Sequence, residues 1–142
     1  MLIFFVSVLL LLHIPQQPLL NFDGTYTFYT KSLPLCDEVV TKSGNLYMVS
    51  CDSKKANQTK LKLKNVVGQS VKFEGDKQNF EQTAKSLGKI VFCYQAGDIF
   101  VVEGFCQSFD GWVVSQNQKI NFQLAFDGKY ITVGTPTILG GF

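Results

Sequence analysis

Apolar and polar residues alternate along much of this chain, and glycines interrupt the alternating runs. Gly24 to Thr30 (GTYTFYT) combines threonine with aromatic residues, and Thr59 to Asn65 (TKLKLKN) places Leu61 and Leu63 on one face with lysines on the other. A period of two residues predicts half-buried β-strands. Asp127-Gly128, between two further runs of this kind, is a strong hairpin signal.

One segment has helical spacing. Between Asp76 and Leu87, the residues Phe80, Ala84 and Leu87 share a helix face; Asp76 is placed to cap the start and Gly88 to stop the end. The segment is short, and we expect at most a turn or two. The remaining runs predict about nine short strands and no long helix, which is an all-β fold.

Two stretches of the chain echo one another, which predicts an internal duplication. They are Gly44 to Gly75 and Gly97 to Gly134. The matched landmarks are Gly44-Asn45 with Gly97-Asp98, Cys51 with Cys106, Asn57-Gln58 with Asn117-Gln118, and Gly68 with Gly128. The expected organisation is one domain of two β-sheet and hairpin modules, at about residues 25–77 and 78–134, followed by a loose tail at 135–142. The alternative is a chance likeness between ordinary β-hairpins.

The N-terminus carries an unbroken apolar run, Leu2 to Leu12, which is too short to cross a bilayer. It is typical of a secretory signal peptide, which we place at residues 1–19, ahead of a mature domain at 20–142. The alternative is an uncleaved signal anchor. Four cysteines after this segment and the glycosylation sequon at Asn57 agree with a secreted protein. No second apolar run follows, so we expect no membrane span once the signal is removed.

Counting residues outward from a predicted hairpin turn places the first two cysteines opposite each other. If Ser43-Gly44 forms a two-residue turn between Cys36 to Thr41 and Leu46 to Cys51, then Cys36 faces Cys51. A disulfide closing this hairpin is geometrically plausible.

The charged residues bear on the class of partner. The chain of 142 residues has 13 lysines and no arginine, for a net charge of +2. Bidentate phosphate recognition belongs to arginine, so a nucleic-acid partner is disfavoured. Five of the lysines fall between Lys54 and Lys64. They form either a solvated strand face or a surface for anionic glycans or membranes.

The sequence offers few residues of the kinds that catalysis commonly uses. The single histidine, His13, lies in or beside the signal segment, which disfavours His-dependent catalysis and the usual zinc sites. No cofactor motif is present, and most carboxylates sit at turns. We therefore expect neither an enzyme nor a bound metal or cofactor. Trp112 after the Asp110-Gly111 turn is either a core anchor or an exposed stacking platform. Polar loops between rigid strands suit a hydroxyl-rich ligand.

Several short motifs appear in an order that resembles the cyanovirin-N homology family of lectins. These are Gly44 to Cys51, Ser70 to Phe73, Asn79-Phe80-Glu81-Gln82-Thr83, Gly111-Trp112-Val113-Val114-Ser115, Lys119 to Phe122, and Asp127-Gly128. Together with the duplication they cover about residues 30–133. Ala84 stands where the family has a cysteine, and Cys93 follows later.

The resemblance implies a pseudo-symmetric pair of modules with one disulfide each, which adds Cys93–Cys106 to Cys36–Cys51. It also implies a secreted lectin that binds a mannose-type glycan. The implied glycan-binding residues are Asn79, Gln82, Thr83, Gln107 and Ser108. An equivalent pocket at Asp52, Ser53 and Lys54 is expected to be weak or lost.

A second reading stays open. The chain could be a secreted β-barrel or sandwich that takes an apolar ligand or engages a partner protein, which the 13 phenylalanines favour weakly. A structural or adhesive role is a further option. The oligomeric state does not follow from the sequence.

Overall fold

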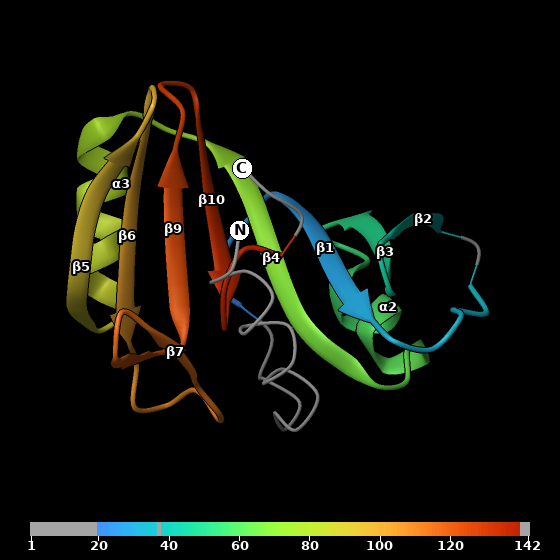
Figure 1. Cartoon of the computed structure of the whole chain (residues 1–142). Helices are drawn as coiled ribbons and strands as arrows, with labels where there is room; N and C mark the ends of the chain where they lie inside the picture. The colour runs from blue at the N-terminus through green and yellow to red at the C-terminus, as the bar shows by residue number, and fades with distance from the viewer. Residues whose placement is uncertain (1–19, 37, 140–142) are drawn as a thin grey trace.

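Eight strands form one antiparallel sheet in the computed structural model, which describes residues 20–36 and 38–139 (Figure 1). The predicted signal peptide, His13 included, lies outside the described residues. The strands are β1 (Thr25–Thr30), β2 (Val39–Ser43), β3 (Leu46–Asp52), β4 (Val66–Glu74), β5 (Lys89–Ala96), β6 (Ile99–Phe105), β7 (Val113–Ser115), β8 (Gln118–Ile120), β9 (Phe122–Phe126) and β10 (Tyr130–Thr135). The helices are α2 (Ala56–Lys62) and α3 (Lys77–Leu87). The prediction of a mostly β protein is confirmed.

The long strand β4 joins the two halves of the sheet. The strand order is β2-β3-β1-β4-β10-β9-β6-β5, so β4 pairs with β1 on one side and with β10 on the other. Figure 1 shows β4 running diagonally between these halves. The strands β7 and β8 form a separate two-stranded hairpin.

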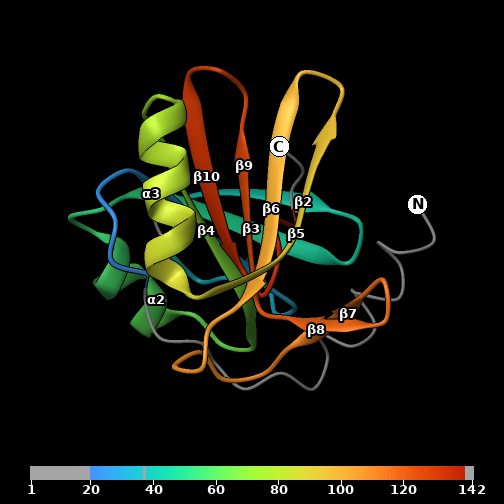
Figure 2. The same cartoon turned by 90° about the vertical axis from the view of Figure 1, so that its left-hand side faces the viewer.

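Strand alternation explains the main core. On β1, Tyr26 and Phe28 are buried on the side of the sheet that carries the helices, while Thr25 and Thr27 point to the other side. The same face receives apolar residues from β4, β9 and β10, and Phe80 of α3 stacks on Phe126 with ring centroids 5.7 Å apart. Figure 2 shows α3 beside the face of the sheet formed by β10, β9, β6 and β5. Removing this apolar surface from water is the main stabilising contribution.

The opposite face carries a smaller apolar cluster at one end. Val113 and Ile120 of the β7–β8 hairpin pack there with Tyr29 and Leu139. Leu139 is 9% exposed and Ile138 is 1% exposed. The expected loose tail from residue 135 is therefore packed against the sheet as far as the structure describes it.

The predicted strand at Thr59 to Asn65 is wrong. Residues Ala56 to Lys62 form helix α2, in which Leu61 is 80% exposed although the strand pattern would have buried it. Ala56, Thr59 and Leu63 are buried instead, which is helical spacing over the same residues. Lys60 and Lys62 in the last turn also favour the helix, because the C-terminal end of a helix dipole attracts cations.

Helix α3 is longer than predicted, at 11 residues, but its ends are those that the sequence indicates. The Asp76 carboxylate accepts a hydrogen bond from the Asn79 amide N–H at 2.8 Å, and the Asn79 side chain accepts from the Asp76 N–H at 3.0 Å. This reciprocal pair satisfies two N–H groups that the first turn leaves without helical partners. Gly88 follows the last residue as predicted.

The described chain is not built from two like modules. Gly44 to Gly75 contains β3, α2 and β4, whereas Gly97 to Gly134 contains β6, β7, β8, β9 and most of β10. Asn57-Gln58 lies in α2, but Asn117 lies in the turn of the β7–β8 hairpin. The matched landmarks therefore occupy different structures, and the predicted duplication is wrong.

The two predicted disulfides, Cys36–Cys51 and Cys93–Cys106, are not formed; all four cysteines are free thiols. The first hairpin turns at Gly44-Asn45, with Gly44 at φ 58°, and pairs Ser43 with Leu46. This register is two residues away from the predicted one, so it does not oppose Cys36 to Cys51. In the second hairpin Cys93 opposes Val102 of β6, whereas Cys106 follows the last residue of that strand.

Neither helix of the described segments has the length and apolar character that a membrane crossing requires.

Candidate functional site

The five residues implied by the lectin resemblance are divided between helix α3 and the loop that follows β6. Asn79 is held in the N-terminal capping pair of α3, and Gln82 and Thr83 follow on that helix. Gln107 and Ser108 lie after β6, where the Ser108 hydroxyl is 3.0 Å from the Cys106 thiol. The contact of Gly88 with Phe105 and Cys106 brings the end of α3 near this loop, whereas Asn79 lies in the first turn. A glycan role for these five residues stays a prediction.

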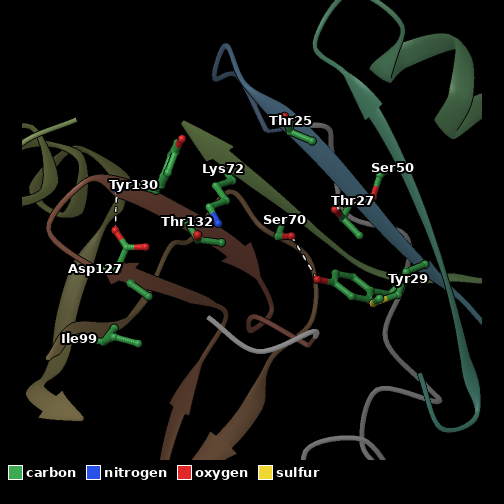
Figure 3. A pocket seen from close by; sticks show the side chains of 12 residues that line it. Thr25, Thr27, Tyr29, Ser50, Ser70, Lys72, Ile99, Asp127, Tyr130 and Thr132 are labelled. Carbon is green, nitrogen blue, oxygen red and sulfur yellow. Dashed lines mark hydrogen bonds between the residues drawn. The ribbon is translucent and has the colours of Figure 1, made fainter. Parts of the chain in front are cut away.

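A different set of polar side chains lines a groove of about 500 Å³ on the sheet face opposite the helices (Figure 3). We call it the hydroxyl groove. It is lined by Thr25, Thr27, Tyr29, Met48, Ser50, Ser70, Lys72, Ile99, Ala125, Asp127, Tyr130 and Thr132.

Strand register places the hydroxyl groups side by side. Thr25 of β1, Lys72 of β4 and Thr132 of β10 oppose one another in a row across three strands. A second row runs through Ser50 of β3, Thr27 of β1 and Ser70 of β4. The groove is therefore built on strands whose other faces are fixed in the main core, which makes its geometry rigid.

Hydrogen bonds orient two pairs of these hydroxyls. The Thr27 and Ser50 hydroxyl oxygens are 3.1 Å apart, and those of Tyr29 and Ser70 are 3.2 Å apart. Figure 3 shows the second pair at the far end of the groove from Tyr130. A hydroxyl has one donor and two acceptor positions, so a paired hydroxyl keeps capacity to bind a ligand.

The other end of the groove is charged and aromatic. The Lys72 ammonium lies 4.8 Å from the centre of the Tyr130 ring, and Lys129 lies 5.2 Å from the same ring. Asp127 accepts hydrogen bonds from the N–H groups of Lys129 at 2.9 Å and Tyr130 at 2.8 Å. These bonds from Tyr130 and Lys129 lower the pKa of Asp127 below its usual value, so its carboxylate is charged at neutral pH.

The side chains of the groove offer several hydrogen-bond donors and acceptors, one ammonium, one carboxylate and the half-buried ring of Tyr130. A serine or threonine nucleophile is activated by an adjacent base, and the hydrogen bonds at 3.1 Å and 3.2 Å described above join hydroxyls to other hydroxyls. Within residues 20–36 and 38–139, His, Cys, Asp and Glu nowhere gather in groups of three or more that could hold a metal ion.

A buried carboxylate lies on the same sheet face, beyond the groove. Glu103 of β6 is 5% exposed and accepts hydrogen bonds from the Ser115 hydroxyl at 2.9 Å and from the Gln123 amide at 3.1 Å. Burial raises the pKa of Glu103, and the two hydrogen bonds oppose that effect in part. The Gln123 carbonyl in turn accepts from the Ile138 N–H at 3.0 Å. This network fastens the β7–β8 hairpin and the C-terminal segment to the sheet.

The thiols of Cys36 and Cys51 lie near a second carboxylate, that of Glu38, beside α2. Glu38 accepts a hydrogen bond from the buried Thr59 hydroxyl at 3.2 Å, and its oxygen is 4.0 Å from the Lys62 ammonium. Burial raises the pKa of both Cys36 and Cys51. A raised pKa leaves little thiolate at neutral pH, so these thiols are poor nucleophiles and act in packing.

Trp112 has a surface position rather than a place in the core. It is 41% exposed, and the Lys119 ammonium lies 4.3 Å from its ring centre. The hydroxyl groove lies elsewhere, and sequence reasoning missed it. Its signal is present as polar residues alternating with apolar ones at Thr25, Thr27, Ser70, Lys72 and Thr132, but only the pairing of distant strands brings them together.

Comparisons with models of known protein families, with curated proteins and with solved structures find no match for this chain.

Proposed function

We propose that the chain is a carbohydrate-binding protein whose ligand lies in the hydroxyl groove. The observation that carries the proposal is the cross-strand array of threonine, serine and tyrosine hydroxyls around Lys72. A sugar presents several hydroxyls at fixed spacing, and a rigid surface with many donors and acceptors matches that chemistry. Polar groups of this kind also give specificity, because a ligand that leaves them unpaired binds poorly.

The charged end of the groove supports the same ligand class. In this proposal Lys72 donates to hydroxyls of the sugar and Asp127 accepts from them, beside the half-buried Tyr130. We propose a mannose-type glycan as the first ligand to examine. In this proposal the protein acts by binding, with no catalytic step.

Secretion belongs to the same proposal. It is supported by the apolar run Leu2 to Leu12 and by the sequon at Asn57, which is exposed on α2. The cysteines no longer support it, because free thiols are uncommon in secreted proteins of this size.

A glycan array followed by calorimetric titration tests the proposal. We expect binding to at least one glycan class on the array. Lys72→Ala should weaken the affinity for that glycan about tenfold, which corresponds to roughly 1.4 kcal/mol. Thr132→Val, which removes one hydroxyl and keeps the side-chain volume, should weaken it as well.

Lys42→Ala is the matched control. Lys42 is exposed on β2 and its ammonium lies 5.5 Å from the centre of the Tyr47 ring, so the variant removes the same kind of cation–ring contact away from the groove. The affinity of Lys42→Ala should equal that of the unmodified protein. The proposal is overturned if the folded protein binds no glycan on the array, or if Lys72→Ala and Lys42→Ala bind equally well.

A further inference from the structure

A second groove, of about 470 Å³, lies on the helix side of the sheet between α3 and the β5–β6 hairpin. Its volume falls within the roughly 300–1,000 Å³ of small-molecule sites. It is separate from the hydroxyl groove, because the sheet itself stands between the two. We call it the α3 groove.

The floor of the α3 groove is apolar. It is formed by Ile90 and Cys93 of β5 together with Phe100 and Val102 of β6. Ile90 is 37% exposed on the edge strand β5, and Phe100 is 36% exposed on its neighbour β6. Both side chains line one groove, and ligand sites are typically concave and mostly apolar.

The wall of the groove is one face of α3. Phe80 and Ala84 are buried against the sheet, and Phe80 stacks on Phe126 of β9. The helix is therefore anchored over β9, and the floor strands extend beyond the area that it covers. This offset leaves the groove open along β5.

The rim of the groove is positively charged. Lys77 and Lys85 line it from α3, with Glu81 between them, which leaves one net positive charge on this wall. The Lys77 ammonium stands over the Phe100 ring, 5.2 Å from its centre, so a cation lies directly at one end of the apolar floor.

We propose that the α3 groove binds an amphiphile with an apolar chain and a single negative charge, such as a fatty acid. The chain lies on the floor formed by β5 and β6. The head group lies at the Lys77 end, where its charge is opposite to that of the rim. An apolar floor with a cation at one end matches the two parts of such a ligand. A neutral chain would form no charge interaction with Lys77.

Cys93 provides a direct readout, because it is an exposed thiol on the groove floor. Decanoate, used below the concentration at which it forms micelles, is the probe. At a decanoate concentration ten times its dissociation constant, alkylation of Cys93 by iodoacetamide should slow about tenfold, since only the ligand-free fraction reacts. Peptide mass spectrometry assigns the modification to Cys93.

Two variants place the ligand by calorimetric titration. Cys93→Trp fills the groove and should abolish decanoate binding, whereas Thr41→Trp, on the opposite edge strand β2, should leave it unchanged. Lys77→Glu should weaken decanoate about tenfold and leave decanol unaffected. Lys54→Glu makes the same charge change away from the groove and serves as its control.

The outcomes separate the parts of the proposal. No protection of Cys93 by decanoate, or full binding by folded Cys93→Trp, rules out a ligand in the α3 groove. Equal affinity for decanoate and decanol, with no effect of Lys77→Glu, rules out the anionic head group. Protection of Cys93 together with selective weakening by Lys77→Glu supports the proposal in full.

Discussion

At the scale of single residues, the polar side chains of this protein fall into two groups by their position. Thr25, Lys72 and Thr132 line the hydroxyl groove and keep contact with water, whereas Glu103 and Asn121 are buried and hold loops to the sheet. The Asn121 side chain accepts from the Cys106 N–H at 2.7 Å and donates to the Cys106 carbonyl at 2.8 Å, which fixes the loop after β6. Polar groups buried in this way must keep their partners, because an unpaired one costs about 1–3 kcal/mol.

Glu103 gives the stability of the protein a specific pH dependence. Because burial raises its pKa, the folded protein binds this proton more tightly than the unfolded chain does. The free energy of unfolding should therefore fall as pH rises above the ordinary glutamate pKa and level off above the folded pKa. Glu103→Gln should remove this fall, as measured by urea unfolding between pH 4.5 and 8.

Glu81→Gln is the control for that measurement, since Glu81 is exposed on α3. It should keep the pH profile of the unmodified protein. An unchanged profile in Glu103→Gln would contradict the assignment of the pH dependence to the buried carboxylate.

At the scale of elements, the sequence predicted strands, turns and helix ends correctly where neighbouring residues alone determine them. The strand at β1, the turn at Asp127-Gly128 and the two ends of α3 were all predicted from neighbouring residues. The alternating run at Thr59 to Asn65 failed, because the spacing of Ala56, Thr59 and Leu63 buries a helix face in the same stretch. Alternation over a few residues cannot decide between these two structures without the partner surface.

The capping pair of α3 should contribute measurably to stability. Asp76→Ala removes an acceptor for the Asn79 N–H and should lower the free energy of unfolding by about 1 kcal/mol. Asp76→Asn keeps an acceptor at the same position and should retain most of the stability. Urea unfolding at pH 7 measures both, and equal stability of Asp76→Ala and the unmodified protein would contradict this role for the cap.

At the scale of the whole molecule, strand pairing decides what the sequence could not. A shift of two residues in the first hairpin is enough to remove the predicted opposition of Cys36 and Cys51. The hydroxyl groove likewise depends on Thr25, Lys72 and Thr132 meeting across three strands that lie far apart in the chain. Composition and turns indicated a β-rich fold, but neither the register nor the sheet order follows from them.

The relative reactivity of the cysteines tests this arrangement of strands. At pH 8, iodoacetamide should modify Cys93 before Cys36 and Cys51, because Cys93 is exposed and burial raises the pKa of the other two. Time-resolved peptide mass spectrometry measures the order. Modification of Cys51 as fast as Cys93, or a disulfide between Cys36 and Cys51 in the native protein, would contradict the structure.

The central position of β4 and β10 also has a consequence for the growing chain. β10 is the last described strand to be synthesised, yet it lies in the middle of the sheet, between β4 and β9. Until β10 emerges, one edge of β4 has no partner strand, although β1 and β3 can already be paired. An unpaired strand edge invites association with other chains. The edge of β4 is therefore open to association with other chains until nearly all of the described residues have been synthesised.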